Sequence, residues 1–366
     1  QERVCRRALM FPKPPGVSLH FFQGAYMLRS ELSRLAVVGA LSAVASIAAA
    51  GDASGARYGE HLEGFKYPYP LQHFAFESQG AHVQMGYMDV PPTGAANGRT
   101  AVLMHGKNFC GATWEDSIKA LTAAGYRVVA PDQIGFCTST KPDHYQYSFH
   151  QLADNTHALL ASLGIQTADI IGHSTGGMLA ARYALSYPEQ TARLVMVNPI
   201  GLEDWKAKGV PWRSVDQWYQ RELKLSADGV RQYERTTYYA GHWKPEYERW
   251  VNMLAGLNAG PGHAKVAWNS ALIYDMIFTQ PVVYELPDLK VPTVLMIGDA
   301  DTTAIGSDIA PPEVKARIGH YNVLGKEAAK AIPGARLVEF PGKGHAPQME
   351  DPAQFNKALV SELDRS

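Results

Sequence analysis

Residues 172–177 read Gly-His-Ser-Thr-Gly-Gly, and they separate the apolar run Ala168–Ile171 from a segment of helical pattern that starts at Met178. The run before them is short and apolar, which is typical of a buried strand. A serine between glycines at a strand-to-helix junction indicates a nucleophile elbow, a tight turn that lifts the hydroxyl above the sheet edge. The alternative is a glycine-rich packing turn. Because the free amides of the new helix would also point at this place, we predict that Ser174 is a nucleophile.

A serine nucleophile needs a base, and the base needs a carboxylate that orients it. His345 follows the last strand-like run, 336–340, in a turn rich in glycine and proline. Asp299 and Asp301 follow the strand-like run before it. The carboxyl ends of strands are where α/β sheets build their sites, and the order serine, aspartate, histidine is one that such triads adopt. We predict that His345 is the base and that one of the two aspartates orients it.

Strand-like and helix-like segments alternate along most of the chain. The predicted strands span residues 71–77, 82–90, 100–104, 126–130, 168–171, 193–197, 291–297 and 336–340, and the predicted helices span 114–124, 148–163, 178–187, 326–332 and 354–363. Glycine or proline ends most of these segments, as expected for short loops. Such alternation predicts the α/β class, with a mostly parallel eight-stranded sheet that carries helices on both faces.

Residues 200–288 interrupt this alternation, because they contain no obvious sheet strand. They hold six of the seven tryptophans of the chain. We predict that they form a helical cap inserted before the last two strands, and that 51–199 and 289–366 form the two parts of the core domain. The aromatic side chains of the cap either pack it onto the core or line a pocket beneath it.

Three further motifs accompany the elbow: His105-Gly106 followed by Trp114, Pro131-Asp-Gln-Ile-Gly135, and Gly298-Asp-Ala-Asp301. Together these motifs resemble the α/β-hydrolase family over about residues 70–364. The resemblance implies that Asp301 is the acid of the triad, with Asp299 as the second choice.

The resemblance also implies an oxyanion hole made by the backbone amides of Lys107 and Thr175. A serine at the elbow separates this chain from the dehalogenase and epoxide hydrolase branches, which use aspartate there. Hydrolysis through an acyl-serine remains, and the aromatic cap favours a carboxylic ester hydrolase that acts on moderately hydrophobic esters. A lactonase, an aminopeptidase of the same fold and a ligand-binding receptor on a hydrolase scaffold stay open as alternatives.

Cys110 and Cys137 follow two strands that we expect to be neighbours in the sheet. Their side chains could therefore meet at the carboxyl edge. We hypothesise a disulfide between them that joins the oxyanion loop to the adjacent loop, and the alternative is two buried thiols.

Composition limits the partners of the protein. The chain has 366 residues with 34 basic and 35 acidic side chains, so no overall field attracts nucleic acid. Motifs for metals or nucleotides, such as His-Glu-x-x-His and Gly-x-Gly-x-x-Gly, are missing from the sequence, and we expect no metal or cofactor. The expected partner is a small-molecule ester.

The first fifty residues have a different character. Residues 27–50 show the charged, apolar and small-residue order of a secretory signal peptide, and residues 1–26 are a leader that we exclude from the fold. The apolar run is too short to span a bilayer. We therefore expect a periplasmic or secreted protein that keeps no stable membrane insertion once the signal is cleaved.

Overall fold

Eight short strands form one sheet in the computed structural model, which describes residues 55–365. The strands are β1 Leu71–Ser78, β2 Ala81–Val90, β3 Thr100–Met104, β4 Arg127–Pro131, β5 Ala168–His173, β6 Thr191–Val197, β7 Thr293–Gly298 and β8 Arg336–Phe340. Every one of them overlaps a strand predicted from the sequence. The eight-stranded sheet expected from the sequence is therefore present.

The strand order is β1-β2-β4-β3-β5-β6-β7-β8, and only β2 runs antiparallel to its two neighbours. Strand β3 lies between β4 and β5, with Leu103 beside Ile171 and Met104 beside Gly172. The carboxyl ends of these three parallel strands therefore meet at one edge of the sheet. The loops that follow them carry the residues of the predicted site.

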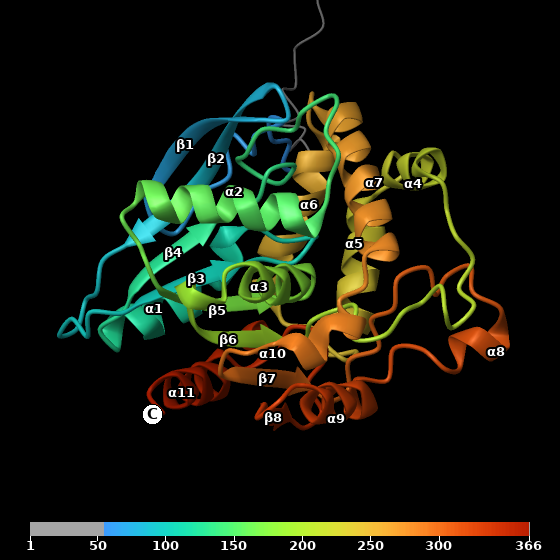
Figure 1. Ribbon diagram of the computed structural model, residues 1–366. Coiled ribbons are helices and arrows are strands. Elements are labelled where there is room, and N and C mark those ends of the chain that lie inside the picture. The colour runs from blue at the N-terminus through green and yellow to red at the C-terminus, as the bar shows by residue number, and fades with distance from the viewer. Residues whose placement is uncertain (1–54, 366) are drawn as a thin grey trace, which may run out of the picture. The chain divides into compact units, whose positions relative to one another are not determined.

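Helices cover both faces of the sheet because its central strands are apolar on both sides. The core helices are α1 Glu115–Ala123, α2 Phe149–Ser162, α3 Thr175–Ser186, α8 Pro312–Lys315, α9 Tyr321–Ala331, α10 Pro347–Glu350 and α11 Pro352–Leu363. Val102 and Met104 share a core cluster with residues of α2, α3 and α9. Ala101 and Leu103 point to the opposite face and pack with residues of α1 and α11 (Figure 1).

The cap consists of four helices between β6 and β7, as predicted: α4 Val215–Glu222, α5 Ala227–Tyr233, α6 Glu248–Ala259 and α7 His263–Thr279. A π-helical segment, Glu234–Tyr238, continues directly from α5. The cap helices lie on the side toward which the arrows of β6 and β7 point (Figure 1). Short 3-10 turns span Gly111–Trp114, Pro188–Gln190, Pro245–Tyr247 and Val283–Asp288.

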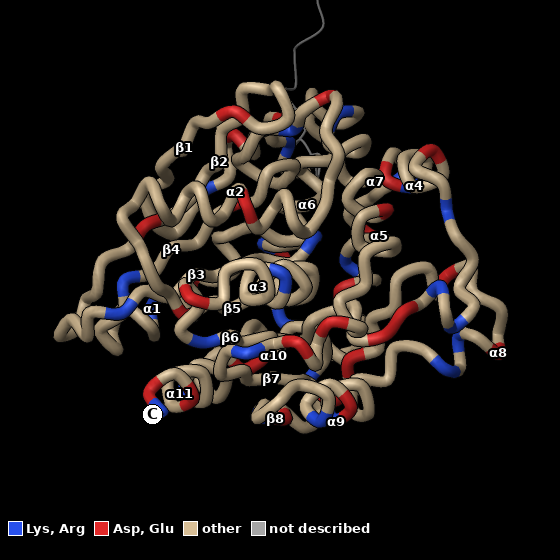
Figure 2. Tube along the Cα trace, in the orientation of Figure 1, with Lys and Arg blue, Asp and Glu red and all other residues tan. Residues whose placement is uncertain are grey.

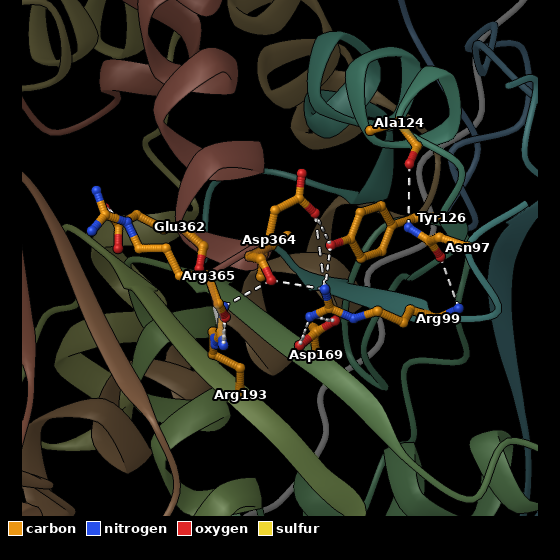
Figure 3. Close-up of polar contacts among 10 residues, drawn as sticks. Asn97, Arg99, Ala124, Tyr126, Asp169, Arg193, Glu362, Asp364 and Arg365 are labelled. Atoms are coloured by element: carbon orange, nitrogen blue, oxygen red, sulfur yellow. Dashed lines mark hydrogen bonds and ion pairs between the residues drawn. The ribbon is translucent and has the colours of Figure 1, made fainter. Parts of the chain in front are cut away.

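The amino end of β5 is tied to the C-terminal helix by a polar network (Figure 3). Arg99 donates two hydrogen bonds to the buried carboxylate of Asp169, at 2.9 and 2.8 Å, and a third to Tyr126. Arg193 donates to the carbonyl of Leu363 at the end of α11. Burial raises the pKa of Asp169, although the charge of Arg99 acts in the opposite direction. The network fixes β5 at the end opposite to the elbow.

The predicted leader (1–26) and signal peptide (27–50) lie outside the described residues. Among residues 55–365, none of the helices has the length and apolar character that a bilayer crossing requires. Basic and acidic residues are interspersed along the trace, and neither sign of charge dominates the face seen in Figure 2.

Candidate active site

Ser174 lies at the turn between β5 and α3, in a backbone conformation that side chains rarely adopt. Its φ is +58° and its ψ is −121°, which is the strained geometry of a nucleophile elbow. The turn is held by a hydrogen bond from the Ser174 amide to the Val197 carbonyl, at 3.0 Å. A glycine is required at Gly176, because a Cβ there would lie 2.2 Å from the Met104 carbonyl oxygen of β3. The glycine lets α3, which begins at Thr175 directly after the serine, lie close against β3.

Ser174, His345 and Asp301 lie in hydrogen-bonding contact, although they are far apart in the sequence. His345 Nδ1 is 2.7 Å from Asp301 Oδ2, and His345 Nε2 is 2.8 Å from Ser174 Oγ. A carboxylate can only accept, so Nδ1 carries the proton and the neutral ring accepts from the serine hydroxyl at Nε2. All three side chains are buried, with 6% of Ser174 and 1% of His345 exposed. The arrangement matches a serine, base and orienting carboxylate.

Asp301, rather than Asp299, is the carboxylate that contacts His345, and two residues that the sequence analysis missed surround it. Asn198 Nδ2 donates to Asp301 Oδ2 at 2.9 Å. Thr303 donates to Oδ1 through its amide and its hydroxyl, at 2.8 and 2.7 Å. Asp299 instead accepts from the Gly342 amide in an exposed turn. With these donors both oxygens of the buried Asp301 side chain are hydrogen-bonded, as a polar group in an apolar interior must be.

The rigid placement of Asn198 comes from the sheet. Asn198 directly follows β6, has a φ of +36°, and exchanges hydrogen bonds with the backbone of Gly298 at the end of β7. Asparagine tolerates a positive φ better than most residues. The carboxyl end of β6 was a signal by which the sequence could have identified this residue.

His345 is fixed by two aromatic neighbours. The ring of Tyr238, from the π-helical cap segment, stacks on the His345 ring with centroids 5.0 Å apart. His173 Nε2 donates to the His345 carbonyl oxygen at 2.7 Å. Burial lowers the pKa of His173 well below its ordinary value, and the neighbouring titratable ring of His345 adds to that effect. His173 is therefore a neutral donor that holds the backbone of the base.

The peptide group between Gly106 and Lys107 lies beside the serine. A Cβ at Gly106 would be 3.0 Å from Ser174 Cβ and 3.4 Å from its Oγ. His105 Nε2 accepts from the Gln133 amide, so its Nδ1 donates to the Gly106 carbonyl at 2.8 Å. In a trans peptide the Lys107 N–H points away from that carbonyl.

The second amide predicted for the oxyanion hole belongs to Thr175. It is in the first turn of α3, where backbone amides have no partner within the helix. Among residues 55–365, neither the Lys107 amide nor the Thr175 amide donates to a backbone acceptor in the turns and loops. Both amides are therefore available for the predicted role.

Two cavities lie next to the Lys107 loop, under the cap. One has a volume of about 40 Å³ and is mostly apolar, with walls that include Phe109, Phe136 and Met253. The other has a volume of about 300 Å³ and reaches the cap helices α4 and α5. Asn108, Glu222 and Leu254 line both of them.

The disulfide hypothesised between Cys110 and Cys137 is not formed, because both are free, buried thiols. The expectation that they meet is correct, since their sulfur atoms lie within 4.8 Å of each other and of the Asp132 carboxylate. Each thiol has another contact: Cys110 Sγ is 3.2 Å from Met253 Sδ, and Cys137 Sγ is 3.4 Å from the Phe109 carbonyl oxygen. The two thiols are therefore close together and unbonded.

Asp132, between the two thiols, is occupied by donors of the protein. Its carboxylate accepts from the Gly111 amide at 2.7 Å, from Tyr67 Oη, and from both the amide and the hydroxyl of Thr138. This set of contacts closes the turn after β4 and gives the carboxylate a structural role.

Comparisons with known proteins identify the family to which the chain belongs. The model of the alpha/beta hydrolase family matches residues 101–358. A crystal structure described as that of a "probable hydrolytic enzyme" from Pseudomonas aeruginosa PAO1 is 63% identical, with a TM-score of 0.84, and the match covers 85% of this chain and 99% of that one.

More distant relatives share the fold. The non-heme chloroperoxidase CPO-A1 of Kitasatospora aureofaciens is 27% identical over 73% of this chain and 93% of its own. The carboxylesterase CesB of Bacillus subtilis is 21% identical, with a TM-score of 0.58, over 81% of this chain and 93% of its own. The chain belongs to the alpha/beta hydrolase family, and it is a hydrolase.

Proposed function

We propose that the protein hydrolyses carboxylic esters through an acyl-enzyme, with Ser174 as nucleophile, His345 as base and Asp301 as the orienting acid. The observation that supports this most directly is the continuous chain of two hydrogen bonds, 2.8 and 2.7 Å long, from the hydroxyl to the carboxylate. The strained backbone at Ser174 is a second support, because it presents the hydroxyl to the site rather than to the core.

In the proposed reaction, Ser174 Oγ attacks the ester carbonyl carbon while His345 Nε2 takes its proton. The carbonyl oxygen becomes an oxyanion between the amides of Lys107 and Thr175. His345 then gives the proton to the leaving alcohol, which departs and leaves Ser174 acylated. A water molecule then attacks the acyl carbon while His345 takes its proton, and His345 passes that proton to Ser174 Oγ as the acyl–Oγ bond breaks and the acid leaves.

The two cavities adjoin the Lys107 loop and are not lined by Ser174 or His345, and their apolar walls support a moderately hydrophobic substrate that extends from the serine under the cap. Phe109, Phe136, Met253 and Leu257 bring apolar area to the smaller one, and Leu225 and Val230 do so in the larger one. Burial of apolar area contributes about 25 cal/mol per Å² to binding. An ester with an apolar acyl or alcohol group would gain most from these walls.

The decisive test is Ser174→Ala, assayed on a nitrophenyl ester and with a fluorophosphonate that labels activated serines. Turnover and labelling should both disappear, while the thermal unfolding temperature stays near that of the wild type. Ser162→Ala, at the end of α2, is the matched control and should keep full activity. Retained turnover or labelling in Ser174→Ala would refute the proposal.

A panel of nitrophenyl esters, lactones and aminoacyl amides would separate the alternatives within the fold. A lactonase would use the same residues on a cyclic ester. Saturable binding of a ligand without repeated turnover would instead identify a receptor.

We also propose that the protein is exported, on the basis of residues 27–50 alone. Cell fractionation and N-terminal sequencing of the mature protein test this. A mature chain that keeps residues 27–50 in the cytoplasm would contradict it.

A further inference from the structure

The side chain of Lys107 connects the predicted oxyanion loop to the cap. Its Nζ donates to Ser270 Oγ of α7 at 2.7 Å and to Glu222 Oε2 of α4 at 3.3 Å. It also lies 3.7 Å from the centre of the Tyr274 ring, in a cation–π contact. A surface lysine would point its amine to water. This one turns inward and makes three contacts with the cap.

The partner carboxylate is buried as deeply as the lysine. Side-chain exposure is 10% for Lys107 and 5% for Glu222. Ser270 donates to the same oxygen of Glu222, and Arg221 donates to the other oxygen at 3.0 Å. Burial alone would raise the pKa of Glu222, but the charge of Lys107, the hydrogen bond from Ser270 and the charge of Arg221 hold it below its usual range. The carboxylate stays ionised inside the protein.

The peptide group between Gly106 and Lys107 is thus held from two sides. On the core side, His105 Nδ1 donates to the Gly106 carbonyl at 2.8 Å. On the cap side, the Lys107 side chain is anchored to α4 and α7. The first anchor fixes the plane of the peptide, and the second limits movement of the Lys107 Cα.

We propose that Glu222, with Ser270, is a positioning residue that holds the Lys107 amide at the oxyanion hole, so that the closed cap completes the catalytic geometry. This inference rests on the proposed ester hydrolysis. Neither Glu222 nor Ser270 touches the reacting atoms, and both act through Lys107.

The test is Glu222→Gln, which keeps the size of the side chain and removes its charge. Complete loss of one oxyanion donor costs about 10²- to 10³-fold in kcat. Displacement of a donor should cost less, so we expect kcat and kcat/KM to fall together by about 10- to 100-fold, with KM within about threefold of wild type.

Two further readouts separate positioning from a purely structural role. A trifluoromethyl ketone, which forms an oxyanion on Ser174, should lose affinity by the same factor as kcat/KM, while the product acid binds as before. In a double-mutant cycle, Glu222→Gln should have little further effect in a Lys107→Met background. Glu115→Gln is the control, since Glu115 joins α1 to the cap through Arg249 in an exposed ion pair. It should leave kcat unchanged.

The inference is overturned if Glu222→Gln keeps kcat/KM within twofold of wild type, loses activity only through KM, or shows its full loss again in the Lys107→Met background. If Glu222→Gln does not fold, Ser270→Ala and Lys107→Met decide, and wild-type kcat in both would overturn it. A wild-type protein without Ser174-dependent turnover would overturn the proposed function as well, whereas a fully active Glu222→Gln would overturn only this inference.

Discussion

The buried amide of Asn198 provides the sharpest test of the acid position. Asn198→Asp changes the donor that faces Asp301 Oδ2 at 2.9 Å into a carboxyl oxygen and keeps both the shape of the side chain and its tolerance of a positive φ. Two carboxylates cannot both be ionised at that distance in a buried site, so the pair will hold one proton.

The free energy needed to keep that proton bound sets how much folding stability Asn198→Asp loses. Holding it at pH 7, about three units above the pKa of a free carboxyl, costs about 4 kcal/mol, since each unit is worth about 1.4 kcal/mol. At pH 5 the cost falls to about 1.5 kcal/mol. The folded variant binds one more proton than the unfolded chain, so its stability relative to wild type must fall as pH rises, by about 1.4 kcal/mol per unit.

Urea unfolding of both proteins at pH 5, 6, 7 and 8 measures this slope, and ester turnover at the same pH values measures the effect on His345. We expect kcat/KM to fall by about 10²-fold or more at pH 7, because a proton shared by the pair weakens the acceptor for His345 Nδ1. Asn322→Asp, which adds a carboxylate on the exposed face of α9, is the control and should show no slope. A destabilisation by Asn198→Asp that is equal at pH 5 and pH 8 would refute the reasoning.

Three other predictions concern buried groups. Burial lowers the pKa of Lys141 from 10.5 to about 8, so the folded state binds fewer protons than the unfolded chain between these values. The wild type should gain about 3 kcal/mol in urea stability relative to Lys141→Met between pH 8 and pH 10.5. Alkylation of the denatured, unreduced protein should label both Cys110 and Cys137, and a cross-linked peptide pair in the mass spectrum would contradict the free thiols. Gly106→Ala should lower kcat/KM by about 10- to 100-fold with a near-normal unfolding temperature, because its Cβ would press on Ser174, and a steady-state assay that shows wild-type kcat/KM would contradict this.

The sheet could be predicted from the sequence because each central strand is a short apolar run between glycines or prolines. Helix ends were less accurate. Helix α3 begins at Thr175 rather than Met178, since the elbow commits the backbone to a helix directly after the serine. Helix α9 begins at Tyr321, five residues before the predicted start at Lys326, because no side chain caps its first turn to mark it in the sequence.

Residues at the ends of strands could be predicted, and residues brought in by the cap could not. Ser174, His345 and Asp301 each follow a strand of the parallel sheet, and topology alone brings such positions to one edge. The stacking of Tyr238 on His345 depends on how the cap packs, which no local pattern encodes. The predicted disulfide is wrong for a related reason: strand order brings Cys110 and Cys137 together, but it does not determine whether the two sulfurs form a bond.

The cap contacts both halves of the proposed machinery. Through Glu222 it reaches the Lys107 loop, and through Tyr238 it reaches His345 by stacking and Asn108 by a hydrogen bond of 2.8 Å. Only 6% of Ser174 is exposed, so we infer that a substrate reaches the hydroxyl when part of the cap moves and that the cap contacts form again once the substrate is bound. Contacts between the cap and remote parts of the substrate would therefore raise kcat as well as lower KM, because they stabilise the closed state in which the chemistry occurs.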